Sequence, residues 1–392
     1  MSRHHMLLAA FVIVLAACAS DRAGMTAPEE AAFTNVLPDV EIRSLNMRHV
    51  QNLAGMHGLE VAFDKDLAVQ SLHHRFHTIS LFPLPTAEVL ADISISDGTG
   101  SVSLANKHAY LSVTGGIRAF DVSDPTDPVL VVDHTTPCGA ASHTLVAGAN
   151  ATTGYFLSAP ASTTGDCPDK IGVLAVSLSS PTSGLFSEVP APGGTSCRQF
   201  AVHSTLNIAA ALCTEGSWDV AETWDITDLY NPVVTGTRWA PVGSTWHSAA
   251  FTWDGEILML GNDMGRNFFY DAADIGSAPL AIHDIPLRGP GPQACSGNFV
   301  PGATDPYFAV LGCGGSGLSL VSITREGSGA VVAEDGFYRG IGSAAYSAYA
   351  FNNFLYASDV NRGLDIVSRS GPRFGRNPMT REPVRINSRS VY

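Results

Sequence analysis

A short segment that recurs along the whole chain constrains the fold more than any other feature of the sequence. The clearest copies are GIRAFDVSDPTDPVLVVD from Gly116, AETWDITDLYNPVVTGT from Ala221 and GLDIVSRSGP from Gly363. Weaker copies begin at Gly172, Asn267 and Gly317, and the weakest, GLEVAFDKDLAV, begins at Gly58. Each copy has an Asp or Ser at the same place, namely Asp64, Asp121, Ser177, Asp225, Asp271, Ser322 and Ser368. These positions lie 46 to 57 residues apart, which indicates one supersecondary unit copied seven times rather than independent domains.

Each unit has the pattern of four short strands. In the unit that contains Asp271, the β-like runs HSAAFTW, EILMLGND, FFYDAAD and PLAIHDI are separated by turn signals. Asp254-Gly255 predicts a type I′ hairpin between the first two runs, and the same layout surrounds Asn106-Lys107 and Asn352-Asn353. Helical periodicity is absent after residue 45, which argues against doubly wound and barrel α/β folds.

Four-stranded units that fill residues 46–392 predict an all-β fold, a β-propeller of seven blades, with six or eight as neighbouring alternatives. A solenoid of stacked sheets is the other architecture with such a repeat. Closure into a ring favours the propeller, because each sheet is then covered on both faces and only short edges remain. The 38 glycines and 23 prolines suit the many turns, and the 45% of hydrophobic residues suit the core. A formal net charge of −14 disfavours a nucleic-acid-binding surface.

The amino-acid sequence of the repeat resembles that of a known family. GIRAFDVSDPTDPVLVV, SHT, WHSAAFTWDG and RGLDIV look like segments of the LVIVD-repeat proteins, and the resemblance covers residues 59–372. It implies a bacterial secreted or surface propeller. It implies no particular reaction, because the family has no settled one and a fold does not fix a function.

The first residues predict export and lipidation. A basic start and an apolar run from Met6 to Ala17 are typical of a signal peptide over residues 1–17. Leu15-Ala16-Ala17-Cys18 resembles the lipobox of bacterial lipoproteins, in which the cysteine carries the lipid; the alternative is an ordinary signal peptide with an incidental cysteine. Residues 18–45 are then the lipidated cysteine and a tether. Ala19 and Ser20 resemble the sorting context of outer-membrane lipoproteins in enteric bacteria, so we expect a lipid-anchored protein of the cell envelope, in the outer membrane if the source is Gram-negative.

The other six cysteines predict three disulfides across hairpins. A disulfide between two antiparallel strands is centred on the turn that joins them. Cys197 and Cys213 are centred on Thr205, and Cys295 and Cys313 on Thr304. Cys138 and Cys167 are centred near Thr152, so all three pairs look like links from the start of one strand to the end of the next. The alternative is six buried free thiols. Disulfides agree with an oxidising compartment such as the periplasm.

Residues at the start of each blade's first strand converge on one mouth of the central channel. His143, Arg198 and His247 each lie seven residues before a first-hairpin turn, and Ser296 has the corresponding place in the next blade. They are the candidate ligand site. Two histidines are too few for a zinc site, so no metal and no cofactor are predicted, and an anion or carboxylate on Arg198 suits the chemistry better. The alternative is a set of polar residues in a wet channel.

Two further patterns have both a structural and a functional interpretation. All five tryptophans lie between Trp218 and Trp253, where they either pack between blades or form a shelf for a sugar or an aromatic ligand. The acids of DVSDPTDP and DITDLYNP either form Asx turns or bind calcium, and Asp before Pro favours the turn.

The chain ends in a basic tail, with arginines at 369, 373, 376, 381, 385 and 389. We predict a binding or scaffolding module of the envelope, whose partners are the membrane through its lipid and an envelope protein or a polysaccharide. The alternative is a hydrolase or lyase with its active site at the channel mouth.

Overall fold

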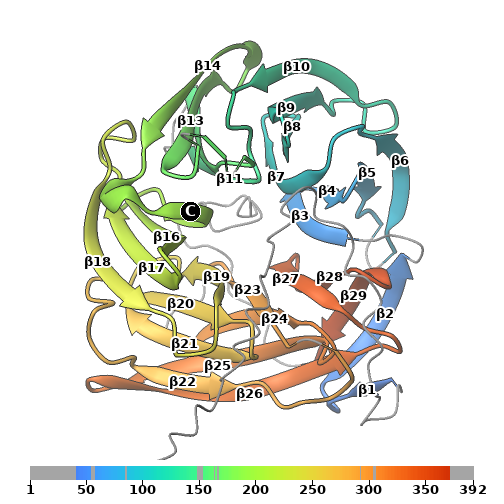
Figure 1. Cartoon of the computed structure of the whole chain (residues 1–392). Coiled ribbons are helices and arrows are strands. Elements are labelled where there is room, and N and C mark those ends of the chain that lie inside the picture. The colour runs from blue at the N-terminus through green and yellow to red at the C-terminus, as the bar shows by residue number, and fades with distance from the viewer. Residues whose placement is uncertain are drawn as a thin grey trace, which may run out of the picture. The chain divides into compact units, whose positions relative to one another are not determined.

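Seven antiparallel sheets are arranged around a common axis in the computed structural model (Figure 1). The structure describes residues 41–53, 58–83, 86–147, 153–162, 164–165, 167–291, 293–302 and 306–370. All of them belong to the unit Ala32–Tyr392. The predicted all-β, seven-bladed propeller with four strands in each blade is confirmed. The segment predicted as a signal peptide, Cys18 and the predicted tail after residue 370 lie outside the described residues.

Five blades are formed by consecutive strands. Blade 1 consists of β3 (Gly58–Asp64), β4 (Leu67–Leu72), β5 (Arg75–Ser80) and β6 (Glu88–Ser94). Blade 2 consists of β7 (Thr99–Ala105), β8 (His108–Val113), β9 (Gly116–Asp121) and β10 (Val129–Thr135). Blade 3 consists of β11 (Ser142–Ala147), β12 (Thr153–Ala159), β13 (Lys170–Ser177) and β14 (Ser180–Pro190), which a short 3-10 turn (Pro192–Gly194) follows. Blade 4 consists of β15 (Ser196–His203), β16 (Ile208–Glu215), β17 (Trp218–Asp225) and β18 (Val233–Trp239). Blade 5 consists of β19 (Trp246–Phe251), β20 (Ile257–Asn262), β21 (Arg266–Asp271) and β22 (Ala281–Asp284).

The last two blades include strands from the beginning of the chain. Blade 6 consists of β23 (Cys295–Phe299), β24 (Tyr307–Cys313), β25 (Leu318–Glu326) and β26 (Gly329–Arg339), and β1 (Ile42–Arg43) pairs with its outer edge. Blade 7 consists of β27 (Ala345–Phe351), β28 (Phe354–Asp359), β29 (Gly363–Arg369) and, as its outer strand, β2 (Met47–Leu53). Pairing of β2 with β29 closes the ring (Figure 1). β1 lies inside the segment predicted as a tether, and Arg369, assigned to the tail, lies in blade 7.

The hydrophobic core lies between the blades. Seven clusters of buried side chains each combine residues of two neighbouring blades, one cluster for each of the seven interfaces. Side chains alternate between the two faces of a strand, so each sheet contributes to the interfaces on both of its sides. This is why the strands read as nearly continuous apolar runs in the sequence.

The first strand of each blade lies nearest the axis and is called here the inner strand (Figure 1). Each blade has four antiparallel strands, so its last strand ends on the side of the ring where its first strand began. All inner strands therefore run in the same direction along the axis. The entry face is the side where the inner strands begin, with the loops that lead into them and the turns between second and third strands. The exit face carries the other turns.

The three predicted disulfides are present, and all lie on the entry face. Cys197 is directly opposite Cys213, and Cys295 is directly opposite Cys313, at the start of one strand and the end of the next. Cys138 and Cys167 form the third bond, with Cα atoms 5.3 Å apart. The strands do not extend that far: Cys138 precedes β11 and Cys167 lies between β12 and β13. This bond therefore joins two loops beyond the hairpin.

Two details of the predicted repeat are wrong. The segment from Gly58 is the inner strand of blade 1, and the place equivalent to Asp121 belongs to Ser80, at the end of the third strand. Asp254-Gly255 is part of a longer loop between Phe251 and Ile257, and of these two residues only Gly255 has a positive φ, 74°. A type I′ turn requires positive φ at both central residues, as found at Asn106-Lys107 and Asn352-Asn353.

The repeated aspartates form Asx turns, as the structural interpretation predicts. Asp121 accepts hydrogen bonds from the backbone N–H and the hydroxyl of Ser123, at 2.8 and 2.6 Å. Asp225 accepts one from the backbone N–H of Thr227 at 2.8 Å. These bonds hold the pKa of both carboxyls below the ordinary value.

Candidate functional site

The inner strands carry a β-bulge close to their start in blades 1, 2, 4, 5 and 7. In blades 4, 5 and 7 the extra residue is Arg198, His247 and Tyr346, respectively. A bulge leaves one residue without a partner in the ladder and redirects its side chain. All three residues are partly exposed, whereas most of the strand that follows each of them is buried.

A ring of hydrogen bonds between neighbouring blades fixes the height of these residues. A side chain of each blade donates to a backbone carbonyl in the inner strand of the next; the donor and acceptor pairs are Ser71–Gly100, Ser112–Ala141, Ser142–Arg198, Arg198–Trp246, Ser248–Cys295, Asn298–Ala348 and Ser347–Leu59. Every interface of the ring has at least one such bond, and the interface of blades 3 and 4 has a second, from Thr144 to Phe200. Since a buried carbonyl without a partner is costly, these bonds set the relative height of the blades.

Of the three predicted mouth residues, the structure places two at this level. Arg198 and His247 lie at the bulge, but His143 does not. The residue of blade 3 that receives the hydrogen bond from the preceding blade is Ala141, two positions earlier. Counting back seven residues from the turn stops two residues short of Ala141, within the regular part of β11, which has no bulge. His143 is 1% exposed and faces blade 2, with Nε2 3.1 Å from Oγ of Ser103.

Arg198 is engaged within the protein. Its Nη1 and Nη2 donate to the two carboxylate oxygens of Asp219 at 2.8 and 3.0 Å, and Nη2 also donates to the carbonyl of Trp246 in blade 5. The side chain of Asp219 is only 7% exposed, and that of Arg198 is 36% exposed. The bidentate geometry predicted for an external carboxylate is therefore used by an internal one.

His247 and Tyr346 meet across blade 6. Their rings lie edge to face with centroids 6.1 Å apart, although they belong to blades 5 and 7. Side chains from two blades that are not neighbours can touch only if both point inward over the strand between them. Blade 6 allows this approach because it has the small residues Ser296 and Gly297 at this level. Ser296 follows Cys295, whose carbonyl accepts the hydrogen bond from blade 5, as His247 follows Trp246 in blade 5.

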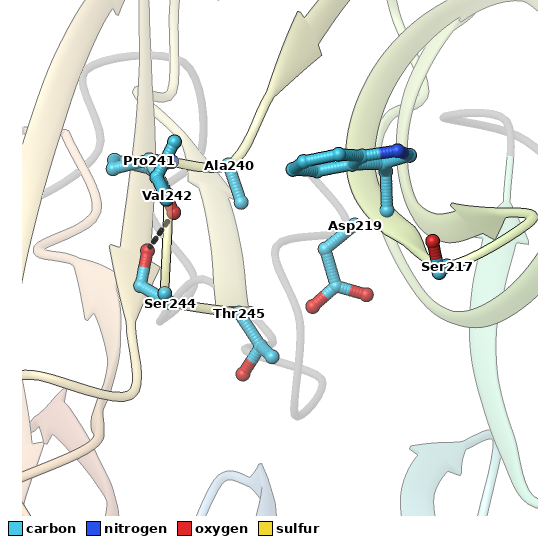
Figure 2. Close-up of a pocket in the computed structure, with 9 residues that line it drawn as sticks. Ser217, Asp219, Ala240, Pro241, Val242, Ser244 and Thr245 are labelled. Atoms are coloured by element: carbon cyan, nitrogen blue, oxygen red, sulfur yellow. Dashed lines mark hydrogen bonds between the residues drawn. The ribbon is translucent and has the colours of Figure 1, made fainter. Parts of the chain in front are cut away.

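A shallow pocket lies beside Arg198 on the entry face (Figure 2). Its volume is about 270 Å³, and it lies between the start of β17 and the loop from β18 to β19. Trp218 and Asp219 line one side, and Ala240, Val242 and Thr245 line the other. Figure 2 shows the carboxylate of Asp219 between Thr245 and Ser217. Arg198 therefore orients an acid that faces this pocket.

Four of the five tryptophans fall into two groups, and Trp253 is half-buried. Trp224 and Trp246 are 0% and 1% exposed and belong to interblade clusters, as the packing interpretation predicts. Trp218 and Trp239 are 58% and 46% exposed. They lie on the same face of blade 4, because Trp239 is opposite Val220, two residues from Trp218. The shelf interpretation therefore applies to this second group.

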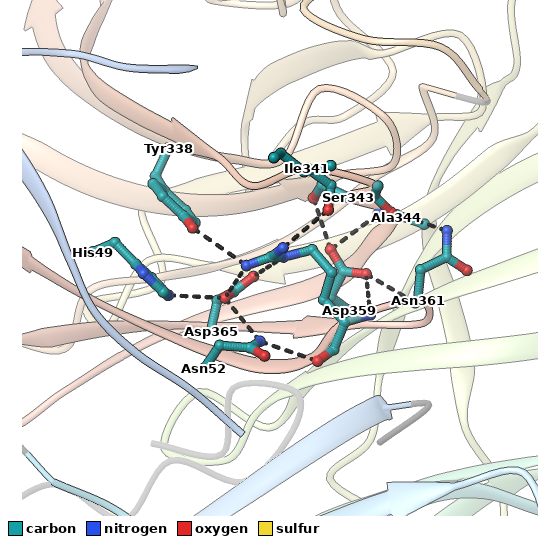
Figure 3. Close-up of polar contacts among 11 residues, drawn as sticks. His49, Asn52, Tyr338, Ile341, Ser343, Ala344, Asp359, Asn361 and Asp365 are labelled. Carbon is teal, nitrogen blue, oxygen red and sulfur yellow. Dashed lines mark hydrogen bonds and ion pairs between the residues drawn. The ribbon is translucent and has the colours of Figure 1, made fainter. Parts of the chain in front are cut away.

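A second polar cluster lies where the ring closes (Figure 3). Asp365 in β29 accepts hydrogen bonds from Asn52 of β2 at 2.9 Å and from two nitrogens of Arg362, both at 2.9 Å, and its Oδ1 lies 3.1 Å from Nε2 of His49. The His49 ring stacks on Tyr338 at 4.9 Å. His49 and Asn52 tie β2 to blade 7, and Arg362 holds the carboxylate from within blade 7, so this cluster belongs to ring closure rather than to a ligand site.

Burial acts to raise the pKa of two carboxyl groups in this cluster, those of Asp359 and Asp365. It raises the pKa of Asp359, which accepts from Ser343 and from the backbone N–H of Ala344. Burial also acts to raise the pKa of Asp365, but the hydrogen bonds and charges of His49 and Arg362 outweigh it and hold that pKa below the ordinary value.

Tyr346 and Asp219 are two site residues that the predictions from the sequence missed. Counting back from the Asn352-Asn353 hairpin by the rule that gives Arg198 and His247 reaches Ala345 and Tyr346, so that signal exists for Tyr346. Asp219 has none, because its role depends on a partner 21 residues away on another strand.

No protein-family model and no curated protein matches the chain. Within the described ranges, no group of three or more His, Cys, Asp or Glu side chains is arranged to hold a metal ion. The same residues include no helix with the length and hydropathy needed to cross a bilayer. The class that the structure defines is a disulfide-linked, seven-bladed β-propeller.

Proposed function

We propose that this chain is a lipid-anchored binding module of a bacterial cell envelope, similar to the LVIVD-repeat propellers. Cys18 carries the lipid in this proposal, after removal of residues 1–17. The lipobox-like residues Leu15-Ala16-Ala17-Cys18 and the three disulfides support it, because such bonds persist in compartments outside the reducing cytosol. Its partner is an envelope protein or a polysaccharide.

The observation that carries the binding role is a pocket with exposed apolar side chains on the face that the three disulfides brace. Trp218 is 58% and Val242 is 89% exposed beside the pocket, and Arg198, His247 and Tyr346 lie at the mouth on the same face. The disulfides join the loops and strand ends of that face. Loops held in one conformation lose less entropy on binding, which favours recognition.

The alternative, a hydrolase or lyase, requires a base and a nucleophile or a complete metal shell at the mouth. Among the described residues at this level, His247 and Tyr346 are a titratable pair whose rings meet, and the other pair, Arg198 and Asp219, is an internal ion pair. Turnover of an envelope polymer that depends on both residues would replace the binding proposal with the enzymatic one.

Anchoring is tested with the full chain in a Gram-negative host. We expect the wild-type protein to fractionate with the outer membrane and its N-terminal peptide to carry acyl chains. Cys18→Ser then releases the protein from that fraction. Unchanged membrane association of Cys18→Ser, with no lipid on the wild-type peptide, contradicts the anchor.

Binding is tested by photocrosslinking in living cells. A photoreactive amino acid replaces Val242 on the entry face or, as the matched control, Leu206 on the exit face, which is 51% exposed. We expect crosslinked envelope components from the first position and a background pattern from the second. Identical patterns from both positions contradict a binding surface on the entry face.

A further inference from the structure

We infer that the pocket between β17 and the β18–β19 loop binds one pyranose unit of an uncharged glycan. This inference rests on the proposed function, because it names the ligand class for the entry face. It starts from the pocket lining, in which a flat aromatic ring, an acid and hydroxyl groups face one space. A sugar ring requires that combination, since it has an apolar C–H face and a polar rim of hydroxyls.

The aromatic component is Trp218, which is 58% exposed at the start of β17, directly after a tight turn. More than half of the indole surface is therefore available to a ligand. A large apolar side chain that is exposed on a strand can mark a binding site. Trp239 is 46% exposed on the same face of the blade, and Val242 is 89% exposed on the opposite wall. Val242 therefore offers apolar surface at the pocket for an adjoining sugar unit.

The polar component is fixed in advance. The carboxylate of Asp219 is held by two nitrogens of Arg198, so its orientation does not depend on a ligand. Ser217 and Thr245 supply hydroxyls on either side of it (Figure 2). The loop that carries Thr245 is itself held, because the backbone N–H of Thr245 donates to Asp263 at 3.0 Å and Oγ of Ser244 donates to the carbonyl of Pro241 at 2.9 Å. Preorganised donors and acceptors suit the vicinal hydroxyls of a sugar.

Size and charge narrow the ligand class. A volume of about 270 Å³ is below the roughly 300–1,000 Å³ of sites for drug-sized ligands, which fits one ring rather than an enclosed oligomer. The positive charge of Arg198 is neutralised by Asp219, and the chain has a net charge of −14, so an anionic polymer is not favoured. An apolar peptide would leave the hydroxyls of Ser217 and Thr245 without partners.

The test titrates the full chain, purified in detergent, with soluble neutral oligosaccharides that have glucan, mannan, xylan and chitin backbones. Calorimetry gives the affinity, and tryptophan fluorescence reports on the indole. We expect one or more of these probes to bind with a fluorescence change. We also expect Trp218→Ala to weaken that binding by about tenfold or more, Trp218→Phe by less, and Thr245→Val by several-fold.

Leu206→Ala on the exit face is the matched control and should bind like the wild type. The inference is overturned if no neutral probe binds the wild type, or if Trp218→Ala binds as tightly as the wild type while its unfolding curve is unchanged. Loss of binding in Trp218→Ala with an unchanged unfolding curve supports it. Absence of sugar binding together with crosslinks from position 242 rejects the glycan and leaves the proposed function standing.

Discussion

Nε2 of His49 lies 3.1 Å from Oδ1 of Asp365, which joins the first long strand of the propeller to its last, 316 residues apart. Asn52 of β2 and Arg362, which directly precedes β29, donate hydrogen bonds to the same carboxylate. One buried acid therefore accepts the side-chain hydrogen bonds of His49 and Asn52, which hold β2 against β29. Asp365 is 1% exposed. Ring closure therefore depends on an electrostatic contact as well as on the ladder between the two strands.

Asp365→Asn should lower the free energy of unfolding by about 3 kcal/mol, because it leaves a partly buried guanidinium without its counter-charge. Asp284→Asn is the matched control, since Asp284 makes the same two-nitrogen contact with Arg266 at an exposed site, where its side chain is 62% exposed. An exposed pair is worth about 1 kcal/mol or less. Urea unfolding of both variants measures the difference, and equal losses would refute a special role for Asp365.

Glu222→Gln should stabilise the protein near neutral pH. Burial raises the pKa of Glu222, so the folded state binds a proton more readily than the unfolded state does. The resulting cost is absent below the ordinary pKa of 4.5 and grows as pH rises through the folded value. Glutamine avoids this cost and can still accept the hydrogen bond from Nε1 of Trp224. Unfolding curves between pH 4 and pH 8 should show a stability gap that widens with pH.

Asp284→Asn provides a control of opposite sign for that experiment. The hydrogen bond from Arg266 lowers the pKa of Asp284, so its contribution to stability is present above the ordinary value and is lost as pH falls. This variant should therefore be less stable than the wild type at neutral pH and approach it in acid. A gap for Glu222→Gln that stays constant with pH contradicts the assignment.

Removal of one disulfide should cost about 3 kcal/mol, the value for closing a loop of this length in the unfolded chain. The pairs Cys295–Cys313 and Cys138–Cys167 close loops with sequence separations of 18 and 29. We expect the double alanine variants of these pairs to lose similar stability in urea unfolding without a reductant. Loss of all three bonds is comparable to the whole stability of an ordinary domain, about 5–15 kcal/mol. A fully reduced protein that unfolds at the wild-type urea concentration rejects this account.

Arg198→Ala should destabilise the protein by about 2 kcal/mol, because Asp219 and the carbonyl of Trp246 lose their donors. Arg198→Lys should recover only part of that loss, since an ammonium group cannot make the two-nitrogen contact with Asp219. Urea unfolding of the two variants checks the order. If lysine is equivalent to arginine, the bidentate geometry has no energetic importance.

The fold could be predicted because its determinants are local and repeated. Turn residues and short apolar runs recur in each unit, so an error in one copy, such as the segment from Gly58, does not change the number of blades. The disulfide pairs were accessible for a related reason: the distance of each cysteine from a hairpin turn selects its partner. The third pair obeys the rule only loosely, because Cys138 and Cys167 lie in loops that extend beyond the strands.

The site could be predicted only in part. Bulges have no clear sequence signature, and they are present in blades 4 and 5 but not in blade 3, which is why Arg198 and His247 reach the mouth while His143 is buried. The contact between Arg198 and Asp219 joins side chains of two strands that are not neighbours in the sheet. The pattern of tryptophans likewise gives no sign that Trp218 is exposed while Trp224 is buried.

The pairing of β2 with β29 also sets the order of events during synthesis. β2, the second of the described strands, finds its partner only after nearly the whole polypeptide has followed, so a nascent molecule is an open arc with two unsatisfied sheet edges. Until the final blade arrives, such an arc is exposed to edge-to-edge association with its neighbours. Release of the last blade, rather than formation of the first, is therefore the step that completes the fold.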